Sequence, residues 1–292
     1  MLQLSPVIAG CMKWGLWGAK FSTPQYLQLI EDCLANYIFS FDHADIYGDY
    51  TVEVEFGNAL KQKPLLRQQL QLITKCGIRR YTPNRPAHKI NSYDSSKEHI
   101  ILSAETSLKN FGTDYLDVLL IHRPDPLMHP QEIAAAFSAL KQSGKVLHVG
   151  VSNFTPTQME MMANVFPVEY NQLEISVLAL EPFHNGTLDK CIQLQIKPMA
   201  WGPLGSGKLF RDPEDERNIR ILSVATILAE KYNASTEQIL LSFLYKHPSG
   251  IIPVMGSTKI ERLITARDAA QIKIEREEWF MLWRASKGHE VP

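Results

Sequence analysis

The chain has 292 residues, of which 45% are hydrophobic and 21% charged, a composition that excludes a disordered or fibrous protein. Its 30 Lys and Arg residues balance 31 Asp and Glu residues, so no net field would draw it to nucleic acid or to an anionic membrane. No apolar run reaches the roughly 18 residues of a membrane-spanning helix, and no signal-peptide pattern opens the chain. We therefore expect a cytoplasmic protein that binds small molecules.

Short apolar runs rich in β-branched residues alternate with longer amphipathic segments along residues 7–257, a pattern typical of βα units around a parallel sheet. Eight such units with short connections favour a closed (β/α)8 TIM barrel, which takes about 250 residues, over a doubly wound sheet, whose GxGxxG fingerprint is absent. We expect one α/β domain over residues 1–292. The predicted strands are residues 7–9, 40–44, 71–75, 116–122, 147–151, 168–172, 197–201 and 251–255.

The segments between the predicted strands carry helix signals. Residues 22–24, Ser-Thr-Pro, place a capping residue before a proline at the first helical position. Ser95 stands three residues before a glutamate, as in a capping box, and Gly112 stands where that helix should end. Beyond the last strand, residues 259–269 and 276–286 predict two final helices that add to the barrel or cover it.

Catalytic residues of such barrels project from the carboxyl ends of the strands and from the loops that follow. The second, third and fourth predicted strands end near Asp42, Lys75 and His122, and Tyr47 follows Asp42 closely. We therefore expect these four side chains to face one pocket.

The four residue types suit the reduction of a carbonyl group, in which the developing alkoxide needs a proton. Tyr47 can supply it, and a nearby Lys75 cation would lower the tyrosine pKa from about 10. Asp42 would hold the lysine ammonium, and His122 could hydrogen-bond the substrate oxygen. Each residue alone is commonly structural, but the set on consecutive strands favours a catalytic site.

Three short motifs lie at these strand ends: D-x-A-x-x-Y-G at residues 42–48, L-L-I-H at 119–122 and G-V-S-N-F at 150–154. With them the chain resembles the aldo-keto reductase family over nearly its whole length, and it is most similar to a bacterial branch of oxidoreductases of unassigned substrate. The resemblance implies the same catalytic roles for the four residues. It also implies a monomer or a weak homo-oligomer.

Hydride transfer needs a carrier, and the loops after the seventh and eighth strands of a barrel often bind phosphate. Glycines in the first of these loops would let backbone N–H groups approach a pyrophosphate. In the second loop, two hydroxyls and two cations meet near a helix N-terminus. The predicted cofactor residues there are Gly202, Pro203, Leu204, Gly205, Ser206, Gly207, Lys208, Gly256, Ser257, Thr258, Lys259 and Arg262.

The resemblance makes the cofactor NADP(H), with NADPH preferred over NADH, because the family's second loop holds the adenosine 2′-phosphate. It implies that Ser152, Asn153 and Gln172 hydrogen-bond the nicotinamide amide and that Trp201 stacks on the ring. The chain departs from the family at Thr265 and Ala266, where many relatives have a Glu-Asn pair near the adenine. Contacts to the adenine are thus expected to differ.

Three other features complete the predictions. His43 replaces a frequent threonine, should point away from the strand face that carries Asp42, and receives no role. The four cysteines form no CxxC pair, so we expect free thiols in a reducing compartment and no metal site. They are Cys11, Cys33, Cys76 and Cys191.

The substrate would be selected by loops at the barrel mouth. Trp14, Trp17, Tyr50 and the segment after Arg123 are candidates, although any of these aromatic residues could equally belong to the core or the surface. Residues 78–93 are polar and irregular and predict a further loop near the mouth.

Two other functions stay open on the sequence. One is a regulatory subunit that binds NADP(H) and senses it with slow or no turnover, as potassium-channel β subunits of the same family do. The other is a non-redox barrel in which the Lys75 amine forms a Schiff base. Borohydride trapping at Lys75 would identify the latter.

Overall fold

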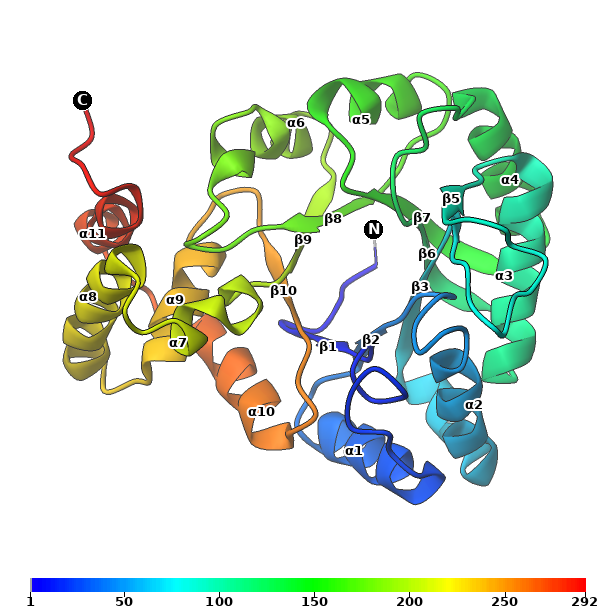
Figure 1. Ribbon diagram of the computed structural model, residues 1–292, viewed down its shortest axis with the longest axis horizontal. Helices are drawn as coiled ribbons and strands as arrows, with labels where there is room; N and C mark the ends of the chain where they lie inside the picture. The colour runs from blue at the N-terminus through cyan, green and yellow to red at the C-terminus, as the bar shows by residue number, and fades with distance from the viewer. Residues whose placement is uncertain (1) are drawn as a thin grey trace.

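A computed structural model of the chain describes residues 2–292; Met1, which the predicted domain 1–292 includes, lies outside the described residues. Eight parallel strands close into a barrel, in the order β1-β10-β9-β8-β7-β6-β3-β2 (Figure 1). The predicted barrel is therefore confirmed. The strands are β1 (Ile8–Gly10), β2 (Ser40–Asp42), β3 (Gln71–Cys76), β6 (Leu116–Ile121), β7 (Val146–Ser152), β8 (Tyr170–Glu174), β9 (Lys197–Trp201) and β10 (Ile252–Met255).

The barrel closes where β1 lies between β2 and β10. Ala9 pairs with Phe41 on one side, and Ile8 pairs with Val254 on the other. Successive side chains of a strand alternate between the barrel interior and the surrounding helices, which is why the strands are apolar on both faces. The interior cluster comprises Leu4, Ile8, Ile73, Val118, Leu120, Tyr170, Met199 and Val254.

Helices cover the outside of the barrel (Figure 1). The first, α1, starts after Ser22, whose backbone N–H donates to the Gln25 side chain at 2.9 Å. The cap of α3 is Ser96, whose hydroxyl accepts from the His99 N–H, so the predicted cap at Ser95 is wrong by one residue. The surrounding helices are α1 (Thr23–Ala35), α2 (Val52–Gln62), α3 (Lys97–Phe111), α4 (Pro130–Gln142), α5 (Pro156–Ala163), α6 (Thr187–Gln193), α9 (Thr236–Tyr245) and α10 (Ile260–Asp268).

The helix after the last strand, α10, belongs to this ring, whereas α8 (Glu216–Tyr232) and α11 (Arg276–Lys287) pack on each other at the edge of the molecule (Figure 1). Lys231 of α8 donates to Glu278 of α11 at 2.6 Å. Of the two predicted final helices, the first thus covers the barrel and the second is an addition to it. Short helical segments lie at η1 (Pro64–Gln69), η2 (Glu181–Phe183), η3 (Gly205–Gly207), α7 (Lys208–Arg211) and η4 (Ala269–Gln271).

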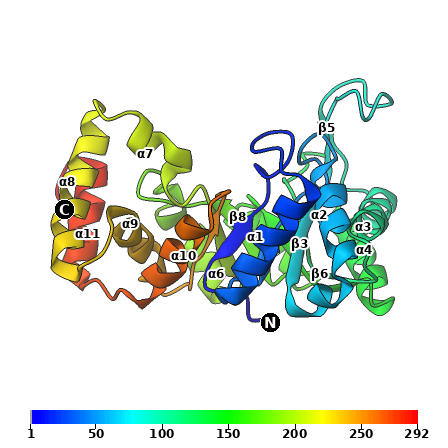
Figure 2. The same cartoon turned by 90° about the horizontal axis from the view of Figure 1, so that it is seen from below.

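The carboxyl ends of the strands form one mouth. The loop after β1, the hairpin of β4 (Ile78–Arg79) and β5 (Ser92–Tyr93), and α7 all rise at this end, opposite the N-terminus (Figure 2). The predicted loop 78–93 thus contains a short hairpin. Among residues 2–292, no helix combines the length and apolarity needed to cross a membrane.

Candidate active site

The four predicted catalytic residues lie together at the mouth. The ammonium group of Lys75, whose side chain is 1% exposed, lies 2.8 Å from the Asp42 carboxylate and 3.1 Å from the Tyr47 hydroxyl. It also donates to the backbone carbonyl of His43 at 2.7 Å. The His122 ring faces the Tyr47 ring, with 6.1 Å between the ring centres.

The strand pleat accounts for this convergence. Because alternate residues share a face, Asp42 follows Ser40, Lys75 follows Ile73 and His122 follows Leu120 onto the interior face at the barrel mouth. His43, one residue out of phase, points outward and packs between the rings of Phe56 and Phe111, as expected.

Tyr47 reaches the site from the turn after β2. Gly48 follows it with φ of +59°, in the left-handed region that favours glycine. A Cβ at this position would lie 2.8 Å from the Thr51 hydroxyl and from a Val52 methyl group. The turn therefore requires a glycine to present the phenol to Lys75.

Burial dominates the acidity of the site. It raises the pKa of the Tyr47 phenol above its ordinary value and outweighs the opposite effect of the Lys75 cation. The expected lowering of this pKa is therefore wrong in net direction, because desolvation exceeds the attraction of one charge. For Lys75 itself, burial alone favours the neutral amine, but Asp42 and Tyr47 raise the net pKa of the ammonium.

His122 is a neutral imidazole. Burial first, and the Lys75 and Arg123 cations second, hold its pKa well below the usual range. Its Nδ1 atom is buried without a hydrogen-bond partner among the described residues. The site therefore contains a protonated phenol, a neutral imidazole and a charged lysine.

The predicted nicotinamide residues form one hydrogen-bonded chain beside this group. Gln172 donates from Nε2 to Asp42 at 2.7 Å, a contact that sequence reasoning did not anticipate. The Ser152 hydroxyl donates to the Gln172 carbonyl at 2.8 Å, and the Asn153 amide donates to the Ser152 hydroxyl at 2.8 Å. The Trp201 indole N–H donates to Asn153 at 3.1 Å. The orientation of the Trp201 ring is thus fixed relative to Lys75 through Asp42.

The loop after β9 contains several residues in left-handed backbone conformations. Residues 202, 205, 206 and 207 all have positive φ, and Ser206 is the one non-glycine among them. Arg211 secures this strained turn by donating to the Ser206 carbonyl at 2.8 Å and to the Gly207 carbonyl at 3.3 Å. A cavity of about 780 Å³ opens beside the loop, lined by Glu174, Leu178, Ala179, Gly205, Lys208, Arg211, Asp212, Asp215, Arg217 and Asn218.

The loop after β10 lies directly before α10. The Ser257 hydroxyl accepts from the Lys259 backbone N–H at 3.1 Å and forms the turn into the helix. Lys259 and Arg262 are exposed, and neither lies within ion-pair distance of a carboxylate in the part of the chain that is described. Two uncompensated cations therefore stand at a helix start, together with the Thr258 hydroxyl.

Trp14 does not line the mouth. Its side chain is 0% exposed and packs against Phe41 and Phe56, and its indole N–H donates to the Ser257 carbonyl at 3.0 Å. The predicted substrate contact is wrong for this residue, because the β1 loop folds back and turns the ring into the core. Trp14 therefore supports the loop after β10 from the core side, through its hydrogen bond to Ser257.

Tyr50 lies at the rim. Its hydroxyl accepts from the Arg80 N–H at 2.9 Å, and the Arg85 guanidinium stacks 4.3 Å above its ring. Trp17 is closer to the reacting groups, with its ring centre 6.1 Å from that of Tyr47. Arg80, which sequence reasoning missed, lies 5.0 Å over the Trp17 ring, and no local sequence signal marks it.

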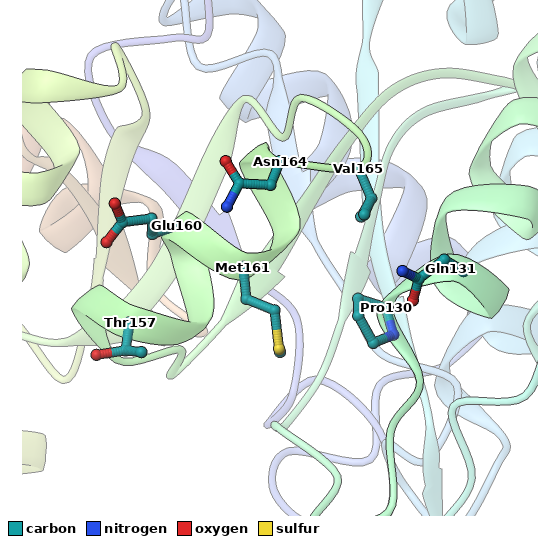
Figure 3. Close-up of a pocket in the computed structure, with 7 residues that line it drawn as sticks. All are labelled: Pro130, Gln131, Thr157, Glu160, Met161, Asn164 and Val165. Atoms are coloured by element: carbon teal, nitrogen blue, oxygen red, sulfur yellow. The ribbon is translucent and has the colours of Figure 1, made fainter.

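A second hollow lies away from these residues. It is a groove of about 370 Å³ between the start of α4 and α5, and none of its lining residues is a candidate site residue (Figure 3). They are Pro130, Gln131, Thr157, Glu160, Met161, Asn164 and Val165.

Comparison with known proteins agrees with the geometry. The model of the aldo/keto reductase family matches residues 6–286. An uncharacterized oxidoreductase of Bacillus subtilis, YcsN, is 45% identical over 100% of this chain and 97% of its own. A 6-dehydroglucose reductase of Agrobacterium fabrum is 37% identical over 99% of this chain and 97% of its own.

The fold recurs in solved structures. The aldo/keto reductase of Klebsiella pneumoniae, in complex with NADP and acetate, superposes with a TM-score of 0.77 at 23% identity, covering 99% of this chain and 93% of that one. Barrel, converging side chains and family model agree, and the chain belongs to the aldo/keto reductases, a family of oxidoreductases.

Proposed function

We propose that this protein reduces aldehydes or ketones to alcohols with NADPH as cofactor, and that Tyr47 donates the proton. The single observation that carries this is the buried Lys75 ammonium, held between the Asp42 carboxylate and the Tyr47 hydroxyl. NADPH, when bound, would supply the hydride. The Agrobacterium relative is a 6-dehydroglucose reductase, which supports carbonyl reduction as the reaction class.

The residues around the mouth fit this cofactor. Trp201 offers an aromatic surface for the nicotinamide ring, and Asn153 fixes its orientation. Lys259 and Arg262 offer exposed cations for a 2′-phosphate at the start of α10, where the helix dipole also favours an anion. The glycines of the loop after β9 have no side chains to keep a pyrophosphate away from the backbone.

The charges of the site favour proton donation. Tyr47 holds its proton at physiological pH, as an ordinary phenol does, and burial raises its pKa further. When the proton leaves for the carbonyl oxygen, the tyrosinate remains 3.1 Å from the Lys75 ammonium. At an effective dielectric constant of about 20, this attraction amounts to about 5 kcal/mol. His122, neutral and opposite Tyr47, is placed to hydrogen-bond the same oxygen.

The same charges disfavour Schiff-base chemistry. A nucleophilic lysine must be a neutral amine with an open approach, but Lys75 is 1% exposed and carries a raised pKa. Its ammonium is hydrogen-bonded to Asp42, Tyr47 and the His43 carbonyl. We therefore assign Lys75 the electrostatic role.

The test measures consumption of NADPH, and separately of NADH, by the purified protein with a panel of aldehydes and ketones. Tyr47→Phe should lower kcat by about 100-fold or more, the usual contribution of a general acid, and leave the NADPH Kd within about two-fold. Tyr37→Phe, at a 76% exposed tyrosine remote from the mouth, is the matched control and should keep the wild-type rate.

Two results would contradict the proposal in different ways. Tight NADPH binding without consumption by the wild-type protein would favour the NADP(H)-sensing subunit instead. Absence of NADPH binding would refute the assignment of both phosphate loops. A single domain over residues 1–292, a cytoplasmic location and a small-molecule carbonyl partner stay predictions.

A further inference from the structure

One cation at the mouth is unlike the other partly buried arginines. Arg123 follows His122 directly, and its guanidinium lies 5.9 Å from the centre of the Trp201 ring. Within residues 2–292, no carboxylate lies within 4.0 Å of it, and it makes no hydrogen bond. By contrast, Arg67 is paired with Asp117 and Arg267 with Asp268. Arg85 and Arg217 also lack a carboxylate, but they donate to backbone carbonyl oxygens.

Three acidic residues of the mouth region already have polar partners. Asp42 is neutralised by Lys75, and Asp49 is paired with Arg80 at 2.9 Å. Asp125, two residues after Arg123, accepts from the Ser95 hydroxyl at 2.9 Å and from the Leu127 N–H at 2.8 Å. These three carboxylates therefore do not pair with Arg123, and Glu174, which neighbours Trp201 in the sheet, also lies more than 4.0 Å from it.

This charge lies beside residues of the proposed site. The Arg123 guanidinium lies 5.9 Å from the centre of the Trp201 ring, whose orientation is fixed by its hydrogen bond to Asn153. Arg123 also contributes to the low pKa of His122, which places its charge close to the proposed reaction centre. Across the mouth, Arg80 over Trp17 forms a similar pair, but its charge is balanced by Asp49.

A half-buried guanidinium without a partner is costly unless a ligand pairs with it, since burial weakens its hydration. The planar guanidinium suits bidentate pairing with a carboxylate or a phosphate. We propose that the carbonyl substrate carries such an anionic group and that Arg123 binds it, while Tyr47 and His122 hold the carbonyl oxygen. This inference rests on the reductase function proposed above.

The test compares three aromatic aldehydes that differ only in the group opposite the aldehyde: benzaldehyde, 4-carboxybenzaldehyde and 4-formylphenyl phosphate. For the wild type, KM should be at least about 10-fold lower for one of the two anionic aldehydes than for benzaldehyde. The two anionic aldehydes distinguish carboxylate from phosphate. Arg123→Met should bring the KM values for the anionic aldehydes to within about two-fold of its own KM for benzaldehyde, and Arg123→Lys should restore part of the difference.

A matched control is available in α11. Arg276 is exposed and lies 5.8 Å over the Phe280 ring, so Arg276→Met removes a similar arginine–aromatic pair far from the mouth. It should leave all three KM values unchanged. The NADPH Kd, measured by fluorescence titration, should be the same in the wild type and in Arg123→Met.

The outcomes separate this inference from the proposed function. Equal wild-type KM values for the three aldehydes would overturn the anion preference while the reductase function stands. A large rise of the NADPH Kd in Arg123→Met would also overturn it, because Arg123 would then belong to the cofactor site. Failure of the wild type to reduce any of the three, or any other carbonyl of the panel, would refute the reductase itself.

Discussion

Replacing His43 with leucine is expected to stabilise the folded protein, and increasingly so in acid. Both ring nitrogens of His43 are buried without hydrogen-bond partners among residues 2–292. Each unpaired nitrogen carries a desolvation penalty of about 1–3 kcal/mol. Leucine removes both penalties but loses some of the ring packing on Phe56 and Phe111. At neutral pH the free energy of unfolding should therefore rise by about 2 kcal/mol.

The pH dependence follows from the histidine pKa. Burial first, and the Lys75 cation second, lower the pKa of His43 to about 3 in the folded chain, against about 6.5 in the unfolded chain. Between these values only the unfolded state binds the proton, so the wild-type protein loses stability as pH falls below about 6.5. The loss is about 1.4 kcal/mol per pH unit, which makes about 2 kcal/mol at pH 5. The His43→Leu variant lacks this loss of stability.

Urea unfolding of both proteins at pH 7.5, 6 and 5 measures the effect. The stability difference should widen from about 2 kcal/mol at pH 7.5 to about 4 kcal/mol at pH 5. His129→Leu, at an exposed histidine, is the control and should open no such gap. A difference between His43→Leu and the wild type that stays constant over this pH range would refute the reasoning, because it would mean that the buried ring takes up its proton as easily as the unfolded one.

Three further predictions concern the site. Trp14→Phe should raise the NADPH Kd about three- to ten-fold, because the Ser257 carbonyl loses its indole donor; fluorescence titration measures this, and an unchanged Kd would contradict the supporting role. Lys75→Met should lower the free energy of unfolding, measured by urea titration, by about 3–5 kcal/mol, because the buried Asp42 carboxylate loses its cation. It should also abolish NADPH consumption, and retained consumption would contradict the electrostatic role of Lys75. Arg262→Ala should raise the Kd for NADPH about ten-fold while that for NADH stays within two-fold, and an equal rise for both would show that it does not meet the 2′-phosphate.

The sequence predicts those parts of the site that depend on strand periodicity. Asp42, Lys75 and His122 could be placed together because each ends a strand on the same face of the pleat, and the outward position of His43 follows from the same rule. The number of strands and the closed barrel follow from the spacing of apolar runs. These features are local or repeat regularly, so one sequence suffices to read them.

Contacts between distant segments could not be predicted in this way. The sequence marks Trp14 as an aromatic residue in a loop, but only the path of that loop brings the ring into the core under Ser257. The net pKa direction of Tyr47 depends on how completely the surrounding loops remove water, which no motif encodes. The pairing of α8 with α11 likewise needs the fold, since an apolar helix face does not identify its partner.

The closure of the barrel has a consequence for synthesis of the chain. The proposed catalytic residues leave the ribosome early, since they all lie between positions 42 and 122. Ile8, however, pairs with Val254, so one edge of β1 stays unpaired until β10 has been synthesised. During that interval β1 presents an unpaired strand edge, which is the part of a nascent barrel most prone to associate with other chains. Truncations that end before β10 should therefore aggregate rather than yield a partial enzyme.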